Sequence, residues 1–144
     1  MKTIRLVATA ITASLGFAST VVAQDTDMGA AVQIELNAVT ANEGSCTLTF
    51  LVTNGHVSPI TKVVYETVLF DSAGQVERLT LFDFGTLPPG RPRVRQFSIP
   101  GLACEDLSQV LINGARTCEA PDLADSACEA GLILQTRTRI GVIG

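Results

Sequence analysis

Three arginines at alternate positions are the residues whose type and spacing most suggest chemistry. Arg91, Arg93 and Arg95 are separated by single residues, so on an extended strand all three project from one face. Each guanidinium group can donate paired hydrogen bonds to a carboxylate or a phosphate. The row therefore predicts either an anion-binding surface or a solvated face that keeps an edge strand from pairing with other chains. Arg137 and Arg139 repeat the spacing and are expected to extend the patch.

Catalytic residues are not expected. His56 is the only histidine, and it follows an Asn-Gly pair that predicts an exposed turn, whereas a Ser-His-Asp or Cys-His arrangement needs a histidine base. Asp71 and Asp83 lie near the ends of adjacent predicted strands, but Asp71 stands where a turn uses a side-chain oxygen to accept local backbone hydrogen bonds. The glycines are scattered singly, so no phosphate-binding loop is present. We expect no enzymatic activity, no metal and no cofactor.

The start of the chain has the three parts of a secretory signal peptide. Two basic residues precede an apolar stretch over 6–18, and Val21 and Ala23 occupy the −3 and −1 positions of a small-residue cleavage site. The apolar stretch is shorter than the ~20 residues that a membrane-spanning helix needs. No twin-arginine pair and no lipid-accepting cysteine accompany it. We predict cleavage after Ala23 and a periplasmic or secreted bacterial protein.

Charge limits the classes of partner. Removal of residues 1–23 leaves eight basic and fourteen acidic residues, a net charge of −6. An acidic domain does not suit nucleic acid, because neutralising phosphates requires clustered Lys and Arg. No later apolar stretch is long enough to cross a membrane. The expected partner is another periplasmic or envelope protein.

Four cysteines predict two disulfide bonds, since an even number of cysteines in an exported chain is typical of a disulfide framework. Three pairings are possible. Proximity in the sequence favours Cys118 with Cys128, which leaves Cys46 with Cys104, but the sequence does not exclude the other pairings. A zinc site is not expected, because no Cys-x-x-Cys pair occurs.

The remaining pattern predicts β-structure. Apolar residues alternate with polar ones in the first segment, as in a half-buried strand. Strand-like segments are expected at 32–37, 46–53, 62–70, 76–84, 91–99, 109–113 and 132–143. A short helical turn is expected over 121–130. We divide the chain into a signal peptide (1–23), a flexible mature N-terminus (24–31) and one all-β, immunoglobulin-like antiparallel sandwich (32–144), although the strand count also fits a small barrel.

One predicted strand has two apolar faces. Phe82 and Phe84 share a face, and Leu79 and Leu81 share the other. We expect the aromatic residues of the strands to pack in the core. The second face is then covered by the C-terminal segment or by a partner, and an exposed apolar strip there is a binding candidate.

Four short motifs follow one another along the chain: Leu51-Val-Thr-Asn54, Ile60-Thr-Lys-Val-Val64, Leu69-Phe-Asp-Ser-Ala-Gly74 and Leu87-Pro-Pro-Gly90. Together they resemble the pattern of the FxLYD-type immunoglobulin-like domains of bacterial envelopes. The likeness covers about half of the mature chain, and residues 104–144 have no counterpart in it. The whole chain is also similar to small uncharacterised exported proteins of alphaproteobacteria. Neither resemblance implies catalytic residues.

These observations favour a non-enzymatic periplasmic binding or accessory module that engages another envelope protein. Two alternatives stay open at this point. One is a small-anion carrier or hydrolase-like enzyme that uses carboxylates or arginines in a cleft. The other is a structural envelope protein with no discrete ligand.

Overall fold

The computed structural model describes residues 29–144. The predicted signal peptide over 1–23 lies outside the described residues. No helix within 29–144 is long and apolar enough to cross a membrane. Ala31, at the end of the predicted flexible segment, is 7 % exposed, and its carbonyl accepts a hydrogen bond of 2.8 Å from the Gly55 amide.

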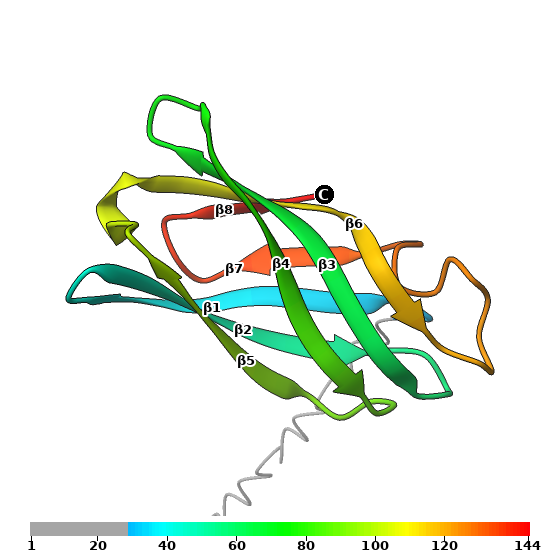
Figure 1. The fold of residues 1–144 in the computed structure, drawn as a ribbon. Coiled ribbons are helices and arrows are strands. Elements are labelled where there is room, and N and C mark those ends of the chain that lie inside the picture. Colours follow the sequence, from blue (N-terminus) through cyan, green and yellow to red (C-terminus); the bar gives the residue numbers. More distant parts are fainter. Residues whose placement is uncertain (1–28) are drawn as a thin grey trace, which may run out of the picture.

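Two four-stranded sheets pack face to face (Figure 1), which confirms the predicted all-β sandwich. Sheet A has the order β5 (Arg93–Pro100), β2 (Ser45–Asn54), β1 (Val32–Asn42) and β7 (Ile133–Thr136). Sheet B has the order β4 (Val76–Leu87), β3 (Ile60–Asp71), β6 (Leu107–Glu119) and β8 (Gly141–Ile143). The strands pair in antiparallel fashion except β1 with β7 and β6 with β8, which are parallel.

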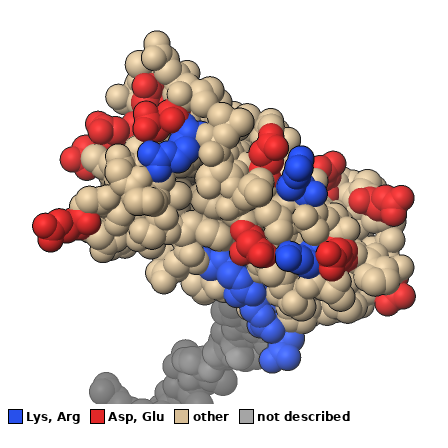
Figure 2. Space-filling view, in the orientation of Figure 1, with Lys and Arg blue, Asp and Glu red and all other residues tan. Residues whose placement is uncertain are grey.

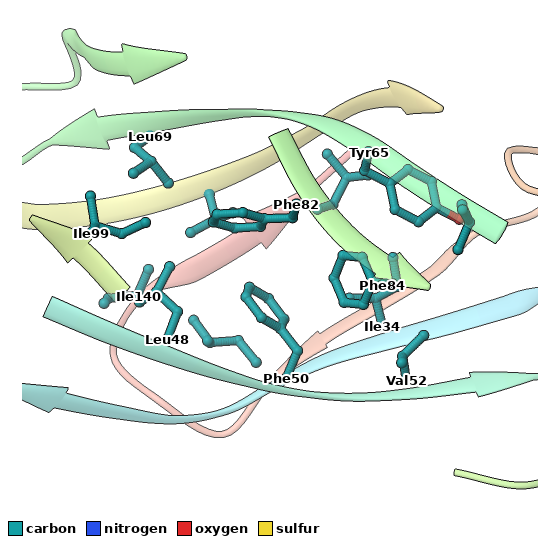
Figure 3. Close-up of a cluster of buried hydrophobic side chains, with 14 of the residues drawn as sticks. Ile34, Leu48, Phe50, Val52, Tyr65, Leu69, Phe82, Phe84, Ile99 and Ile140 are labelled. Atoms are coloured by element: carbon teal, nitrogen blue, oxygen red, sulfur yellow. The ribbon is translucent and has the colours of Figure 1, made fainter. Parts of the chain in front are cut away.

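The core lies between the sheets and follows from the alternation of the sequence. On β2, the apolar residues at every second position are fully buried on the face toward the other sheet, and the residues between them lie on the opposite face. Phe50 from sheet A meets Phe82 and Phe84 from sheet B, with ring centroids 5.7 Å apart in both cases (Figure 3). Phe97 stacks on Phe82 with centroids 4.1 Å apart. The prediction that the strand aromatics form the core is confirmed for these four rings. It is wrong for Phe70, which is half-buried on the outer face of sheet B, opposite the exposed Val76.

Both predicted disulfides are present. Cys46–Cys104 ties β2 to the single helical turn of the described chain, a 3-10 turn over Cys104–Asp106. Cys118–Cys128 closes the loop that follows β6. The Tyr65 hydroxyl donates a hydrogen bond of 2.6 Å to the Cys128 carbonyl, so the loop is also fastened to the middle of sheet B.

The C-terminal quarter differs from the prediction in two ways. Residues 121–130, expected as a helical turn, form a series of hydrogen-bonded turns instead, because the disulfide and the Tyr65 contact hold the segment at fixed points. The expected strand over 132–143 divides into β7 and β8, which belong to different sheets. The chain crosses between them at 137–140, where the Thr138 hydroxyl accepts a hydrogen bond of 3.1 Å from the Ile140 amide.

Candidate binding site

The arginine row occupies the edge of the sandwich at which β5 and β4 lie on opposite sheets. Arg93 and Arg95 lie on the same side of β5 as Phe97 and Ile99, which pack in the core. Val94 lies on the other side of the strand and is 58 % exposed. The predicted period is therefore correct. The side that carries the arginines, however, is the inner side of an edge strand rather than a solvated outer face.

Arg95 is a structural link between the sheets. Its Nε donates a hydrogen bond of 2.7 Å to the Phe84 carbonyl on β4, and its Nη2 lies 3.4 Å from the Thr86 carbonyl. Arg78 makes a reciprocal link, because its Nη1 donates to the Pro100 carbonyl at the end of β5, at 2.7 Å. Two arginines thus satisfy carbonyl groups along this edge and join the two sheets.

Arg137 and Arg139 serve the opposite edge. The Arg137 Nε lies 2.8 Å from Oε1 of Glu35, whose residue is 6 % exposed. The hydrogen bond from the Asn37 side chain and that from Arg137 lower the pKa of the Glu35 carboxyl. Arg139 donates to the carbonyls of Leu107 and Cys104. These two arginines follow β7, while the first three precede or belong to β5, so the structure places the two groups on opposite edges of sheet A. The expected single patch is not formed.

Arg91 and Arg93 remain as the accessible part of the row. Arg91 is exposed in the β4–β5 loop, and β5 begins only at Arg93, which is half-buried. The Arg93 Nη1 donates to the Pro92 carbonyl at 3.2 Å, which leaves four of its five N–H donors without an acceptor among the described residues. Neither residue has a carboxylate within ion-pair distance among residues 29–144. Figure 2 shows a stripe of basic side chains that runs to the lower margin of the molecule, where β5 lies in Figure 1.

A buried asparagine fixes the loop that carries these arginines. Asn54, at the end of β2, is 0 % exposed. Its Nδ2 donates to the carbonyls of Leu87 at 3.0 Å and Ser58 at 2.9 Å. Its own carbonyl accepts a hydrogen bond of 2.7 Å from the Gly90 amide. Gly90 has φ +62°, a conformation that glycine adopts without steric cost. The β4–β5 loop is therefore positioned from within the sandwich. From the sequence, Asn54 is expected only as part of a turn, and the signal for its role is its place at the end of an alternating strand.

The residues considered for catalysis do not form a site. The His56 Nε2 donates a hydrogen bond of 2.8 Å to the Ala127 carbonyl, so this residue is half-buried and not the exposed turn residue that was expected. Oδ1 of Asp71 accepts from the amides of Ala73 and Gln75, which confirms its predicted turn role. Asp83 lies opposite Val64, seven residues from Asp71 along β3, roughly 23 Å away.

The outer faces of the two sheets differ in character. The outer face of sheet A consists mainly of hydroxyl and amide side chains, among them Gln33, Thr47, Thr49, Thr53, Gln96 and Gln135. Sheet B has an apolar outer face, here called the outer apolar row, in which one side chain from each strand lies beside the next: Leu79, Val68, Leu111 and Ile143. Leu79 is 63 % exposed and Leu81, on the same strand face, 54 %. The strip expected beside Phe82 and Phe84 is therefore uncovered, and Figure 2 shows uncharged surface in the middle of this face.

The fold defines the chain as a two-sheet β-sandwich with two disulfide bonds and two arginine-linked edges. No protein-family model matches the chain, and no curated protein matches it. Among solved structures, the one described as the structural characterization of IrmA from Escherichia coli is similar, with a TM-score of 0.54 and 13 % sequence identity. The match covers 74 % of this chain and 91 % of that chain. At this identity the likeness supports the fold alone.

Proposed function

We propose that this chain is a non-enzymatic binding module of the bacterial cell envelope that engages another envelope protein through Arg91 and Arg93. The observation that carries the proposal is the geometry of the β4–β5 loop. Buried Asn54 holds the base of the loop, and two guanidinium groups without a carboxylate partner in the described chain stand at its surface. Because the backbone of the loop is already held in place, less backbone freedom is lost when the two guanidinium groups bind a partner.

The chemistry of these groups specifies the partner's side of the contact. Guanidinium groups bind carboxylates in a bidentate geometry, so the partner is expected to present Asp or Glu side chains. The chain as a whole is acidic, with a net charge of −4 over its full length. An acidic partner therefore meets favourable potential near the loop, which helps to orient the encounter.

An exported location is part of the same proposal. Two disulfide bonds fit an oxidising compartment such as the periplasm. The signal-peptide pattern of the sequence points to the same compartment. The predicted likeness to FxLYD-type envelope domains is consistent with it and adds no residue to the site.

The test is a charge reversal that leaves the fold intact. The Arg93→Glu variant and the native protein are expressed in the natural host, crosslinked briefly, and isolated by affinity capture for mass spectrometry. We expect one stoichiometric partner with the native protein and its loss with the variant, at an unchanged melting temperature. Arg116→Glu is the matched control, because Arg116 is exposed on β6, away from the loop. An identical partner profile for native protein and Arg93→Glu would exclude the loop as the interface.

A second candidate function rests on an open depression of about 490 Å³ beside the opposite edge. Arg137 and Arg139 line it together with the end of β1, and the Arg137 side chain is 69 % exposed despite its contact with Glu35. A small anion carrier would use this depression. Ligand binding raises the melting temperature of the native state, so a thermal-shift screen with millimolar phosphate, citrate and sulfate tests the idea. If none of these anions raises the melting temperature, the small-anion carrier is excluded and the binding module is the function that stays.

A further inference from the structure

We propose that two copies of this chain associate through the outer face of sheet B. The inference is independent of the β4–β5 loop, because it rests on a different surface. Exposed apolar patches of several hundred Å² on a monomer mark interaction sites. The outer apolar row spans all four strands of sheet B, and Phe70 and Val76 form a second cross-strand apolar pair beside it.

The strand register shows that the residues of this face point away from the core. Val68 alternates with Leu69, which belongs to the core, and it lies opposite Leu79 on β4 and Leu111 on β6. Ile143 lies opposite Leu111 on β8 and is 41 % exposed. Val68 is only 7 % exposed, because its neighbours in the row flank it, so the row is a continuous apolar surface and not a set of separate side chains.

A second copy is the occupant that this face complements. A two-fold axis parallel to the strands, between β3 and β6, exchanges the positions of the two strands in the facing copy. Val68 then meets Leu111 of the other copy, and Leu79 meets Ile143. The same operation lays Lys62 over Glu119 of the other copy, because these two residues are also register partners on β3 and β6. The apolar row and the Lys62–Glu119 pair are thus self-complementary, as an isologous interface requires, while Glu66 and Asp83 of the same face lie outside these pairs.

The area of the face is at the lower end for such an interface. Strands β3, β4 and β6 have 12, 12 and 13 residues and β8 has 3, so at ~3.3 Å per residue and about 4.8 Å between strands the face covers roughly 600 Å². Two copies together would bury about 1,200 Å², the lower limit of standard protein–protein interfaces. On the outer face of sheet A hydroxyl and amide side chains predominate, and its apolar pair Leu51–Val94 is smaller than the outer apolar row.

The test measures self-association of the purified full-length secreted protein by sedimentation equilibrium over about 1–500 µM. We expect a monomer–dimer equilibrium, weakened at least tenfold by Leu79→Arg and by Ile143→Glu. Val94→Arg is the matched control, because Val94 is an exposed valine on the outer face of sheet A, and it is expected to leave the equilibrium unchanged. Circular dichroism melting confirms that each variant is folded.

A charge swap tests the two-fold geometry itself. Lys62→Glu and Glu119→Lys should each weaken the dimer, and the double variant should restore it, because both the intrachain and the interchain pairs regain opposite charges. A monomer at all concentrations would overturn the proposal. So would a dimer that Leu79→Arg and Ile143→Glu leave intact, since it forms through another surface. A monomer that crosslinks from position 79 to a different protein would show that the face has another occupant.

Discussion

The Arg95 Nε on β5 lies 2.7 Å from the Phe84 carbonyl on β4, across the edge where the two sheets of the sandwich are open. The contact joins strands that belong to different sheets and share no backbone ladder. It satisfies a carbonyl that an edge strand would otherwise present to other chains. One member of the arginine row is therefore a structural residue, which changes the expected effect of its mutation.

Arg95→Ala should lower the free energy of unfolding by about 1–2 kcal/mol, because hydrogen bonds from a charged donor to two carbonyl groups are lost. Arg93→Ala should change it by less than about 0.5 kcal/mol, since that residue makes only a local contact. Urea denaturation followed by circular dichroism measures both. Equal losses for the two variants would contradict the distinction between a structural and an accessible arginine.

Glu35 makes the free energy of unfolding depend on pH in the acidic range. Its hydrogen bonds from Asn37 and Arg137 lower its pKa below the ordinary value of 4.5 in the folded state. The unfolded chain therefore takes up a proton first, and the stabilisation, which is complete above pH 4.5, is lost as the pH falls through the folded-state pKa. Glu35→Gln should be less stable than the native protein at neutral pH, and the difference should shrink in acid.

Chemical denaturation at a series of pH values checks this dependence. Glu43→Gln serves as the control, because Glu43 is exposed in the β1–β2 turn. A difference between native protein and Glu35→Gln that stays constant from about pH 7 to about pH 3 would show that the carboxylate contributes no linked protonation.

The two disulfide bonds should differ in their contribution to stability. Cys46–Cys104 spans 58 residues and Cys118–Cys128 spans 10, and the longer loop restricts the unfolded chain more. Chain-entropy arithmetic gives about 4 kcal/mol for the first and about 3 kcal/mol for the second. Paired Cys→Ala variants, compared by denaturation in the absence of reductant, test the order. A larger loss for the short loop would mean that its contacts with Tyr65 dominate the effect.

Asn54→Ala should destabilise the protein by about 2–3 kcal/mol, because it leaves the buried Leu87 and Ser58 carbonyls without their donor. It should also mobilise the β4–β5 loop, so that the Gly90 amide exchanges faster with deuterium. Asn113→Ala is a control with an exposed side chain. Unchanged Gly90 protection in Asn54→Ala would show that the loop is held by other contacts.

Local patterns in the sequence predict most of the fold. The alternation of Val32, Ile34 and Leu36 and that of β2 identify the residues of sheet A that face the core, because each strand has one buried face. The even cysteine count and short spacing favour the pairing that is found. The division of residues 132–143 between two sheets is not predictable in this way, since the crossing depends on the hydrogen bond that the Thr138 hydroxyl accepts and on which neighbours each short strand finds.

The candidate site is predictable only in part. A period of two correctly places Arg93 and Arg95 on one side of a strand, but the period does not say which side meets solvent. That depends on the position of β5 at an edge, where inward side chains reach carbonyls of the other sheet. The separation of Arg137 and Arg139 from the row follows from strand order, which no local spacing encodes.

The most direct test of the proposed function is photo-crosslinking in living cells from a probe amino acid placed at position 91, with position 49 as the control. Arg91 is exposed in the β4–β5 loop, and Thr49 lies on the polar outer face of sheet A. The proposal predicts one adduct of defined mass from position 91, absent from position 49 and abolished by Arg93→Glu. No adduct from position 91, or the same adducts from both positions, would contradict it.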